Sequence, residues 1–184
     1  MILAFTGAGI SKASGIPTFE DQGDLRTKLS RSYQITNTED YNKIISNMKQ
    51  VCDKAMPNDA HIALAEYNVP VITMNIDGLH RKAGTIDVME IHGVLPNIVL
   101  YGDPAPYYSA AIELTSKLIS GDILLVVGVS FYTNIAHQIK EYAEMYGAKV
   151  EIINDNAEVK VRKFIENNKS NLGTYEELSN REFN

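Results

Sequence analysis

Ile2-Leu3-Ala4-Phe5-Thr6, followed directly by Gly7-Ala8-Gly9-Ile10-Ser11, is the stretch of this sequence that decides its fold. An apolar run without alternation is typical of a strand that is buried on both faces of a sheet. Glycines allow close backbone approach and positive φ angles, and the free N–H groups at a helix start attract phosphate. The stretch therefore predicts a buried strand that leads through a glycine loop into a helix, with a place for a phosphate group at the turn.

The rest of the chain repeats this change from strand to helix. Further strands are predicted at residues 69–73, 123–127 and 150–153, and short extended pieces at residues 88–91 and 97–100. Helical apolar spacing is found at residues 60–65, which Asn58 can cap, and at residues 108–119 and 134–146. Buried strands separated by helices indicate an α/β fold with a Rossmann-like parallel sheet that is covered by helices on both faces.

Two segments depart from this rhythm. Residues 20–57 are more polar, and we expect them to form a small helical module inserted into a single domain of residues 1–184. The chain after Asn167 is also polar, and we expect it to fray.

Several predicted strands end in a glycine or a short polar residue. These residues are Gly7, Asn75, Gly128 with Ser130, and Asn154. In open parallel sheets the ligand crevice lies beyond the carboxyl ends of the strands. Each residue alone is equally consistent with a simple turn, but together they favour a ligand site at this edge.

Composition narrows the class of protein. The chain has 184 residues, and 17 basic against 23 acidic residues give a net charge of −6, which argues against a nucleic-acid-binding surface. We expect no membrane span, because no apolar run approaches the roughly 20 residues required. Cys52 is the only cysteine, so neither a disulfide within the chain nor a cysteine-cluster metal site is expected. A cytoplasmic location follows as the expectation.

The glycine loop differs from that of hydride-transferring dehydrogenases. Their fingerprint has a third glycine where this chain has Lys12. It also has an acidic ribose ligand about 20 residues later, at the end of a second strand. Glu20 and Asp21 come too early for that role, so a dehydrogenase is disfavoured.

Ordered motifs along most of the chain resemble those of the sirtuins, the NAD-dependent protein deacylases. The first signature is Gly7-Ala8-Gly9-Ile10-Ser11-Lys12-Ala13-Ser14-Gly15-Ile16-Pro17-Thr18-Phe19. The later ones are Pro57-Asn58 with His61 and Leu64-Ala65, Thr73-Met74-Asn75-Ile76-Asp77-Gly78-Leu79-His80, Glu90-Ile91-His92-Gly93, Leu100-Tyr101-Gly102-Asp103-Pro104-Ala105-Pro106, Gly128-Val129-Ser130 and Ile153-Asn154.

The resemblance implies that NAD is bound and consumed as a co-substrate. The implied cofactor-binding residues are Gly7, Ala8, Gly9, Ser11, Ile16, Pro17, Phe19, Met74, Ile76, Gly128, Ser130 and Asn154. The implied catalytic residues are His92, Asn75 and Asp77, and the strand Leu100, Tyr101 and Gly102 would pair with an acylated peptide.

In such an enzyme His92 acts as general base on a ribose hydroxyl, because an imidazole pKa suits proton transfer near neutrality. The products are nicotinamide, the deacylated lysine and O-acyl-ADP-ribose. Residue by residue, other interpretations stay open: His92 in a turn, Asp77 as a helix cap, and His61 and His80 in packing or capping. The Tyr107-Tyr108 pair is interpreted as packing at a helix start.

The chain also departs from the family. Sirtuins usually carry four zinc-binding cysteines between the catalytic histidine and the substrate strand, whereas here only the seven residues 94–100 separate Gly93 from Tyr101. We therefore expect no zinc. Glu20, Met74 and Val129 replace the family's usual Arg, Gln and Thr, and Arg26, Lys28 or Arg31 are candidates to supply the missing positive charge.

These departures leave two alternatives beside the deacylase. One is a NAD glycohydrolase or ADP-ribosyl transferase, in which water or another nucleophile replaces the peptide. The other is a non-catalytic module that binds NAD or ADP-ribose.

Overall fold

The centre of the molecule is a five-stranded parallel sheet with the strand order β3-β2-β1-β6-β7. The computed structural model describes residues 1–182, apart from the side chains of Phe19 and Glu20. The sheet consists of β1 Ile2–Thr6, β2 Val71–Thr73, β3 Val88–Glu90, β6 Ile123–Val127 and β7 Lys149–Ile153. The two most apolar strands, β1 and β6, are buried at every residue and pair with each other.

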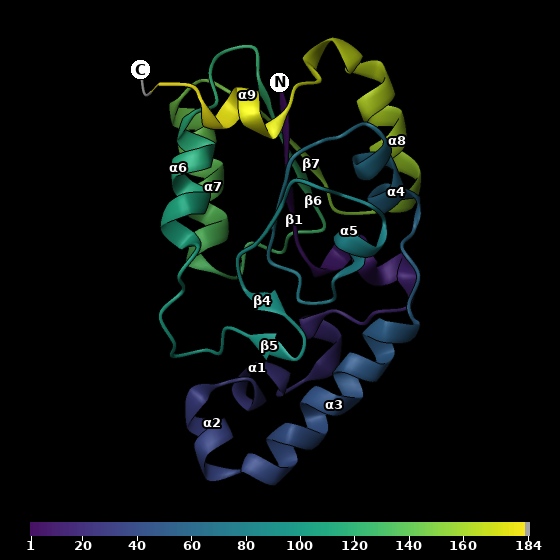
Figure 1. The fold of residues 1–184 in the computed structure, drawn as a ribbon, viewed down its shortest axis with the longest axis vertical. Helices are drawn as coiled ribbons and strands as arrows, with labels where there is room; N and C mark the ends of the chain where they lie inside the picture. Colours follow the sequence, from purple (N-terminus) through teal and green to yellow (C-terminus); the bar gives the residue numbers. More distant parts are fainter. Residues whose placement is uncertain (183–184) are drawn as a thin grey trace.

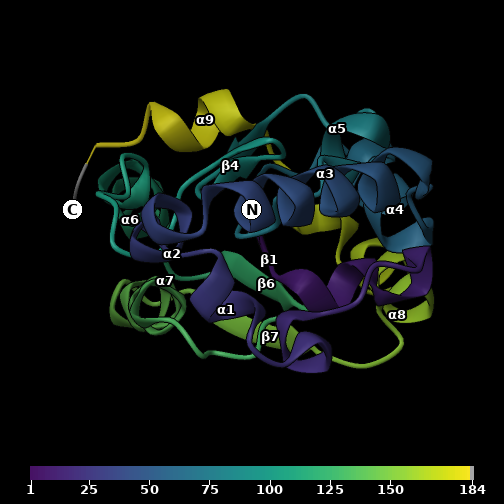
Figure 2. The same ribbon diagram turned by 90° about the horizontal axis from the view of Figure 1, so that it is seen from below.

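Helices cover both faces of the sheet (Figures 1 and 2). One face carries α6 Tyr108–Ser116, α7 Asn134–Met145 and α9 Tyr175–Ser179, and the other carries α4 Asp59–Glu66 and α8 Ala157–Asn167. The short helices η1 Ala8–Ser14, α5 Leu79–Lys82 and η3 Lys169–Asn171 complete this part. The layers confirm the predicted α/β fold.

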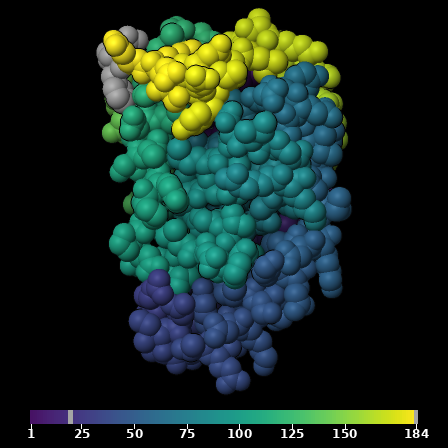
Figure 3. Space-filling model, in the orientation of Figure 1, coloured from purple at the N-terminus to yellow at the C-terminus, as the bar shows by residue number. Residues whose placement is uncertain are grey.

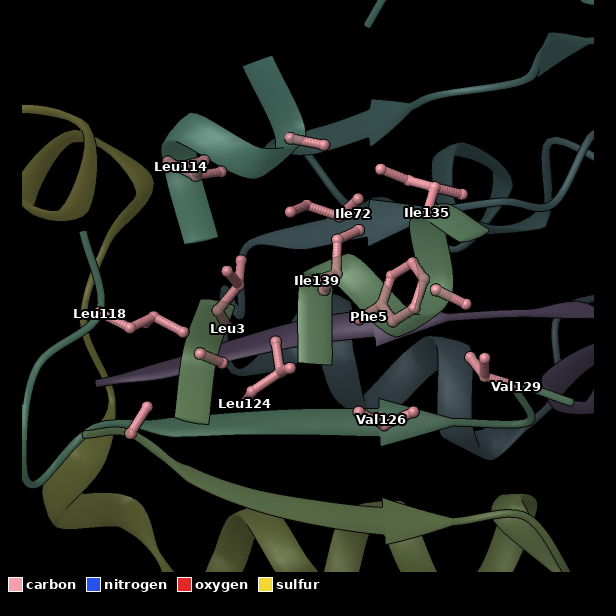
Figure 4. Packing of buried hydrophobic residues seen from close by; sticks show 14 of the residues in the cluster. Leu3, Phe5, Ile72, Leu114, Leu118, Leu124, Val126, Val129, Ile135 and Ile139 are labelled. Carbon is pink, nitrogen blue, oxygen red and sulfur yellow. The ribbon is translucent and has the colours of Figure 1, made fainter. Parts of the chain in front are cut away.

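Successive side chains of each central strand point to opposite faces of the sheet, which explains why two layers of helices are needed. Leu3 and Phe5 point toward α6 and α7, where they pack with Leu124 and Ile139 (Figure 4). Ile2 packs on the opposite face, against α4 and α8. Both faces are apolar, so each must be covered to remove it from water.

A helical segment forms one end of the molecule (Figures 1 and 3). It contains η2 Phe19–Gln22, α1 Leu25–Lys28, α2 Arg31–Thr36 and α3 Thr38–Lys54. Its apolar cluster includes Leu29, Tyr41 and Ile45. Leu95 and Leu100, which lie in and just after the β4–β5 hairpin (residues 93–98), belong to the same cluster. The helical segment and residues 95–100 therefore share one core.

Some sequence-based boundaries need correction. Residues 97–100 were predicted to be a short extended piece, and within them Asn97–Ile98 forms the strand β5, in a two-stranded antiparallel hairpin with Gly93–Val94 (β4). The helix predicted at 108–119 ends at Ser116.

The prediction that the chain frays after Asn167 was wrong. Residues 175–179 form α9, which begins with a capping box at Thr174 and buries Leu178 completely against the core. Arg181 then contacts Asp122 and donates a hydrogen bond to the Lys117 carbonyl. One buried leucine and one ion pair hold a segment whose composition is polar.

None of the helices within the described residues has the length and apolar character needed to cross a bilayer.

Candidate functional site

A cavity of about 440 Å³ lies where the carboxyl ends of the strands meet the helical segment. Its wall includes residues that follow four different strands: Gly7 to Gly9 after β1, Met74 to Ile76 after β2, Gly128 to Ser130 after β6, and Asn154 after β7. Further wall residues are His92, Leu100, Tyr101, Gly102 and Tyr108. The volume falls within the range of ligand pockets, and the location is the one expected for an open parallel sheet.

Two glycine loops touch each other at the base of this cavity. The Gly9 amide donates a hydrogen bond of 2.9 Å to the Gly128 carbonyl, and a Cβ on Gly9 would lie 2.6 Å from the Gly128 Cα. Gly128 has a φ of +65°, and a Cβ there would lie 2.2 Å from the Ile10 nitrogen. These glycines are therefore required for the contact between the loops, in addition to any approach by a ligand.

Ser11, Asn75 and Asp77 form a hydrogen-bonded group behind the cavity wall. The Ser11 hydroxyl donates to Asp77 Oδ2 at 2.7 Å, and the Asn75 amide donates to Ser11 Oγ at 3.2 Å. Asp77 Oδ1 accepts from the Leu79 backbone N–H at 2.9 Å, which is the capping contact considered from the sequence. Only Asn75 of the three is part of the cavity wall, so Asp77 is held by its neighbours in this conformation.

His92 is held by a hydrogen bond at each ring nitrogen. Nδ1 lies 3.1 Å from the Met74 carbonyl oxygen, and Nε2 lies 2.7 Å from the Tyr108 hydroxyl. Because a carbonyl can only accept, Nδ1 carries the proton, and the lone pair of Nε2 accepts from Tyr108. Burial lowers the pKa of His92, and the bond to Met74 opposes this effect in part. His92 is thus neutral, lines the cavity, and has Nε2 as its basic nitrogen.

Behind this site lie two fully buried histidines, His61 and His80, with ring centroids 5.0 Å apart. The Nε2 of His80 lies 2.9 Å from Thr6 Oγ1, and that of His61 lies 3.4 Å from Ser11 Oγ. Neither Nδ1 has a hydrogen-bond partner among the described residues. Burial is the main cause that lowers the pKa of His61 to about 4 and that of His80 to about 3. Both rings are therefore neutral at physiological pH, in agreement with a packing role.

The lowered pKa values of His61 and His80 predict that the protein loses stability in mild acid. The pKa values of both histidines in the folded chain lie below the value of about 6.5 in the unfolded chain. Between the folded and unfolded pKa values the unfolded chain therefore binds more protons than the folded chain. As a result, the free energy of unfolding decreases as the pH falls below about 6.5. We expect the free energy of unfolding to drop by about 3 kcal/mol between pH 6.5 and pH 5. Urea unfolding across this range measures the slope, and His80→Asn should reduce it; an unchanged slope in a folded variant would contradict the assignment.

The remaining predicted residues occupy different places. Gly7, Ala8, Gly9, Met74, Ile76, Gly128, Ser130 and Asn154 line the cavity, as do Leu100, Tyr101 and Gly102. Ile16 packs with the helical segment, Pro17 is exposed, and the side chain of Phe19 lies outside the described part of the structure.

Several of these residues are tied to the protein itself. The Asn154 amide donates to the Val129 carbonyl and accepts from the Val129 N–H, at 2.9 and 3.0 Å, which joins the ends of β6 and β7. The Met74 sulfur accepts a hydrogen bond from the Thr133 hydroxyl at 3.5 Å. Tyr101 pairs through its backbone with the carbonyl of Leu29 and the N–H of Arg31.

The structure distinguishes the three candidate cations and gives Tyr108 a contact that the sequence did not indicate. Of the three candidate cations, Arg26 lines the cavity with its guanidinium 3.9 Å from the Tyr132 ring centroid, whereas Lys28 pairs with Asp24 and Arg31 with Asp103. The interpretation of Tyr108 as packing alone was incomplete. Tyr108 does begin α6 and pack on the core, but its hydroxyl reaches His92, and no spacing in the sequence indicates this contact.

Comparisons with known proteins agree with this arrangement. The model of the Sir2 family matches residues 7–95. An "NAD-dependent protein deacetylase" of Caldivirga maquilingensis is 30% identical, with 83% of this chain and 77% of that protein covered. An "NAD-dependent protein deacylase 2" of Pyrobaculum aerophilum is 31% identical, with 83% and 78% covered.

Solved structures show the same fold. A Sir2 homologue in complex with NAD has a TM-score of 0.82 at 19% identity, covering 94% of this chain and 90% of that one. A Sir2 protein bound to acetylated peptide has a TM-score of 0.79 at 23% identity, covering 92% and 93%. With the ordered motifs, the shared sheet and identities of 30% and above over most of both chains, this chain belongs to the Sir2, or sirtuin, family.

Proposed function

We propose that this chain is an NAD-dependent protein deacylase that removes acyl groups from lysine side chains. The observation that carries the proposal is His92, a neutral histidine that lines the strand-end cavity, with its Nδ1 bonded to the Met74 carbonyl so that Nε2 is its basic nitrogen. The curated relatives that match this chain in sequence are named as deacetylases and deacylases that depend on NAD.

The donor groups in the cavity wall are of the kinds that bind the pyrophosphate of a dinucleotide. The backbone of Ala8 and Ser130 lies in the wall, and Lys12 and Arg26 supply positive charge. Other backbone N–H groups of the two loops are instead bonded within the protein, namely those of Gly7, Gly9, Gly128 and Val129. Backbone N–H groups and cations are the groups that bind pyrophosphate. Arg26 thus fits the role that the sequence left open when Glu20 replaced the family's usual arginine.

NAD, when bound, would supply an activated ribosyl carbon that the acyl oxygen can attack, with nicotinamide as the leaving group. His92 would then accept the proton of a ribose hydroxyl at Nε2, which makes that oxygen nucleophilic. Asn75 lies in the cavity wall, and its amide nitrogen donates to Ser11 Oγ and Asp77 Oδ2 at 3.2 and 3.3 Å. Met74, Ile76 and Leu100 provide apolar wall that excludes water.

Residues 100–102 form the part of the cavity wall against which the peptide would lie. Tyr101 uses its own N–H and carbonyl to pair with Leu29 and Arg31. The Leu100 carbonyl accepts from the Asp103 N–H at 3.0 Å, and Gly102 has a φ of +96°, so these residues form a turn and not a continuous strand edge. An acylated peptide would lie along this wall of the cavity, which Leu100, Tyr101 and Gly102 line.

The test is mass spectrometry after incubation with NAD, with and without acetyl-, succinyl- and long-chain-acyl-lysine peptides. The proposal expects O-acyl-ADP-ribose only when peptide is present. ADP-ribose formed equally without peptide would indicate a glycohydrolase. Calorimetric binding of NAD without turnover would indicate a binding module.

We also propose that the short hairpin stands where the family has its zinc module. Leu95 and Ile98 of the hairpin pack into the apolar cluster that contains Leu29 and Tyr41. This packing would support the cavity wall where the peptide is expected to bind. A Cβ on Gly93 would lie 2.5 Å from the Asn97 carbonyl oxygen, so this tight turn depends on glycine. Among the described residues no group of three or more His, Cys, Asp or Glu side chains could hold a metal ion.

The hairpin proposal predicts that chelators have no effect on stability. Dialysis against EDTA should leave the midpoint of thermal unfolding unchanged, and elemental analysis should find less than stoichiometric zinc. A lower midpoint that zinc restores would show that a metal supports the fold.

A further inference from the structure

Tyr108 occupies the one nitrogen that the proposed reaction needs. Its hydroxyl lies 2.7 Å from His92 Nε2, and the two rings are 5.7 Å apart at an angle of 49°. Since Nδ1 of His92 is committed to the Met74 carbonyl, Nε2 is the basic nitrogen, and the Tyr108 hydroxyl is its hydrogen-bond donor. A substrate hydroxyl must either displace Tyr108 or transfer its proton through it.

The position of Tyr108 argues against displacement. Tyr108 is the first residue of α6, and its side chain packs against the core that includes Ala111 and Leu114 of the same helix. It therefore projects from the start of a helix that packs on the core, and it lies in the wall of the same cavity as His92. Its phenolic oxygen donates its single hydrogen to His92 and retains lone pairs that can accept from a ligand.

We propose that Tyr108 is a second proton-transfer residue, which carries the ribose hydroxyl proton to His92. The inference rests on the proposed deacylase function. In the step, the ribose O–H bond breaks as its proton moves to the Tyr108 oxygen, and the original phenolic proton moves to His92 Nε2. Tyr108 ends the step as a phenol, and His92 as an imidazolium, so the charge balance equals that of direct transfer.

Other groups near the site do not supply this function. The charged residues in the described cavity wall are Lys12, Arg26 and Asp103, and Asp103 is paired with Arg31. Burial raises the pKa of Tyr108, so the residue remains a phenol that can donate its proton near neutrality. The Met74 carbonyl holds the far side of the imidazole and does not titrate.

The experiment compares Tyr108→Phe with Tyr107→Phe. Both changes remove one phenolic hydroxyl at the start of α6, but Tyr107 is 51% exposed and is not in the cavity wall. For Tyr108→Phe we expect kcat for deacylation to fall by roughly 10- to 100-fold with little change in the KM for NAD. Tyr107→Phe should match the unchanged chain.

A second readout separates proton transfer from simple packing. A hydrogen bond to the neutral imidazole disfavours its protonation, so removing the Tyr108 hydroxyl should raise the pKa of His92 by about half to one unit. Histidine NMR titration should show this rise, with His92→Asn used to assign the signal among the four histidines. The acidic limb of the kcat profile should shift upward by the same amount.

The outcomes are distinct. If the unchanged chain forms no O-acyl-ADP-ribose, the deacylase function fails, while the NMR comparison still tests the Tyr108–His92 bond. If the chain is active and Tyr108→Phe equals or exceeds Tyr107→Phe in kcat, the proton-transfer role is overturned. A slower Tyr108→Phe with an unchanged pKa of His92 would also overturn it, because that result describes packing alone.

Discussion

His92→Ala is expected to lower the rate of O-acyl-ADP-ribose formation by roughly 100- to 10,000-fold, because it removes the general base. Binding of NAD should remain, since the loops that contain Gly9 and Gly128 contact each other independently of this side chain. Product formation by mass spectrometry and NAD affinity by calorimetry measure the two effects separately.

The matched control is His137→Ala. His137 is an exposed histidine on α7 whose described ring contact is with Phe131, outside the cavity wall. This variant should deacylate at the normal rate. Normal activity in His92→Ala would refute the assignment of the base, and equal losses in both variants would indicate a general folding defect.

The second large effect is on stability. Gly128→Ala should lower the free energy of unfolding by about 2–5 kcal/mol, combining the cost of a left-handed conformation with that of overlap against packed neighbours. The overlap is severe, because the new Cβ would lie 2.2 Å from the backbone nitrogen of Ile10 and 2.6 Å from the Gly9 Cα. Chemical denaturation measures the loss, and NAD affinity should fall with it.

Gly84→Ala provides the comparison. Gly84 has a φ of +99°, but a Cβ there would meet nothing within 4 Å. It therefore has the backbone cost alone, about 1–2 kcal/mol. If both variants lose the same stability, the contact between the two glycine loops is unimportant.

The sheet and the place of the site could be predicted from local patterns. The strands at 2–6 and 123–127 were predicted with their observed limits, because apolar runs without alternation fit only the two-sided environment of a central parallel strand. The strand-end residues Gly7, Asn75 and Asn154 lie around one cavity, because parallel strands align their carboxyl ends at one edge.

Local patterns were misleading where a few long-range contacts outweigh composition. The segment after Asn167 looked polar, yet Leu178 is completely buried and orders α9. Residues 97–100 were predicted only as a short extended piece, and nothing in them indicated that Ile98 and Leu100 pack into the core of the helical segment. Such contacts join elements far apart in sequence, so periodicity within one element carries no sign of them.

The sequence by itself determined the family, the order of strands and helices, and the residues gathered at the strand ends, because these depend on motif order and on the apolar period of each segment. Only the tertiary structure decided how the side chains of the site are engaged. It directed Asp77 toward Ser11 and Leu79, joined Asn154 to Val129, and placed the hydroxyl of Tyr108 on His92. The physical reason is that a side chain's hydrogen-bond partners are set by how separate elements pack, and the start of α6 meets the loop after β3 only in the folded chain.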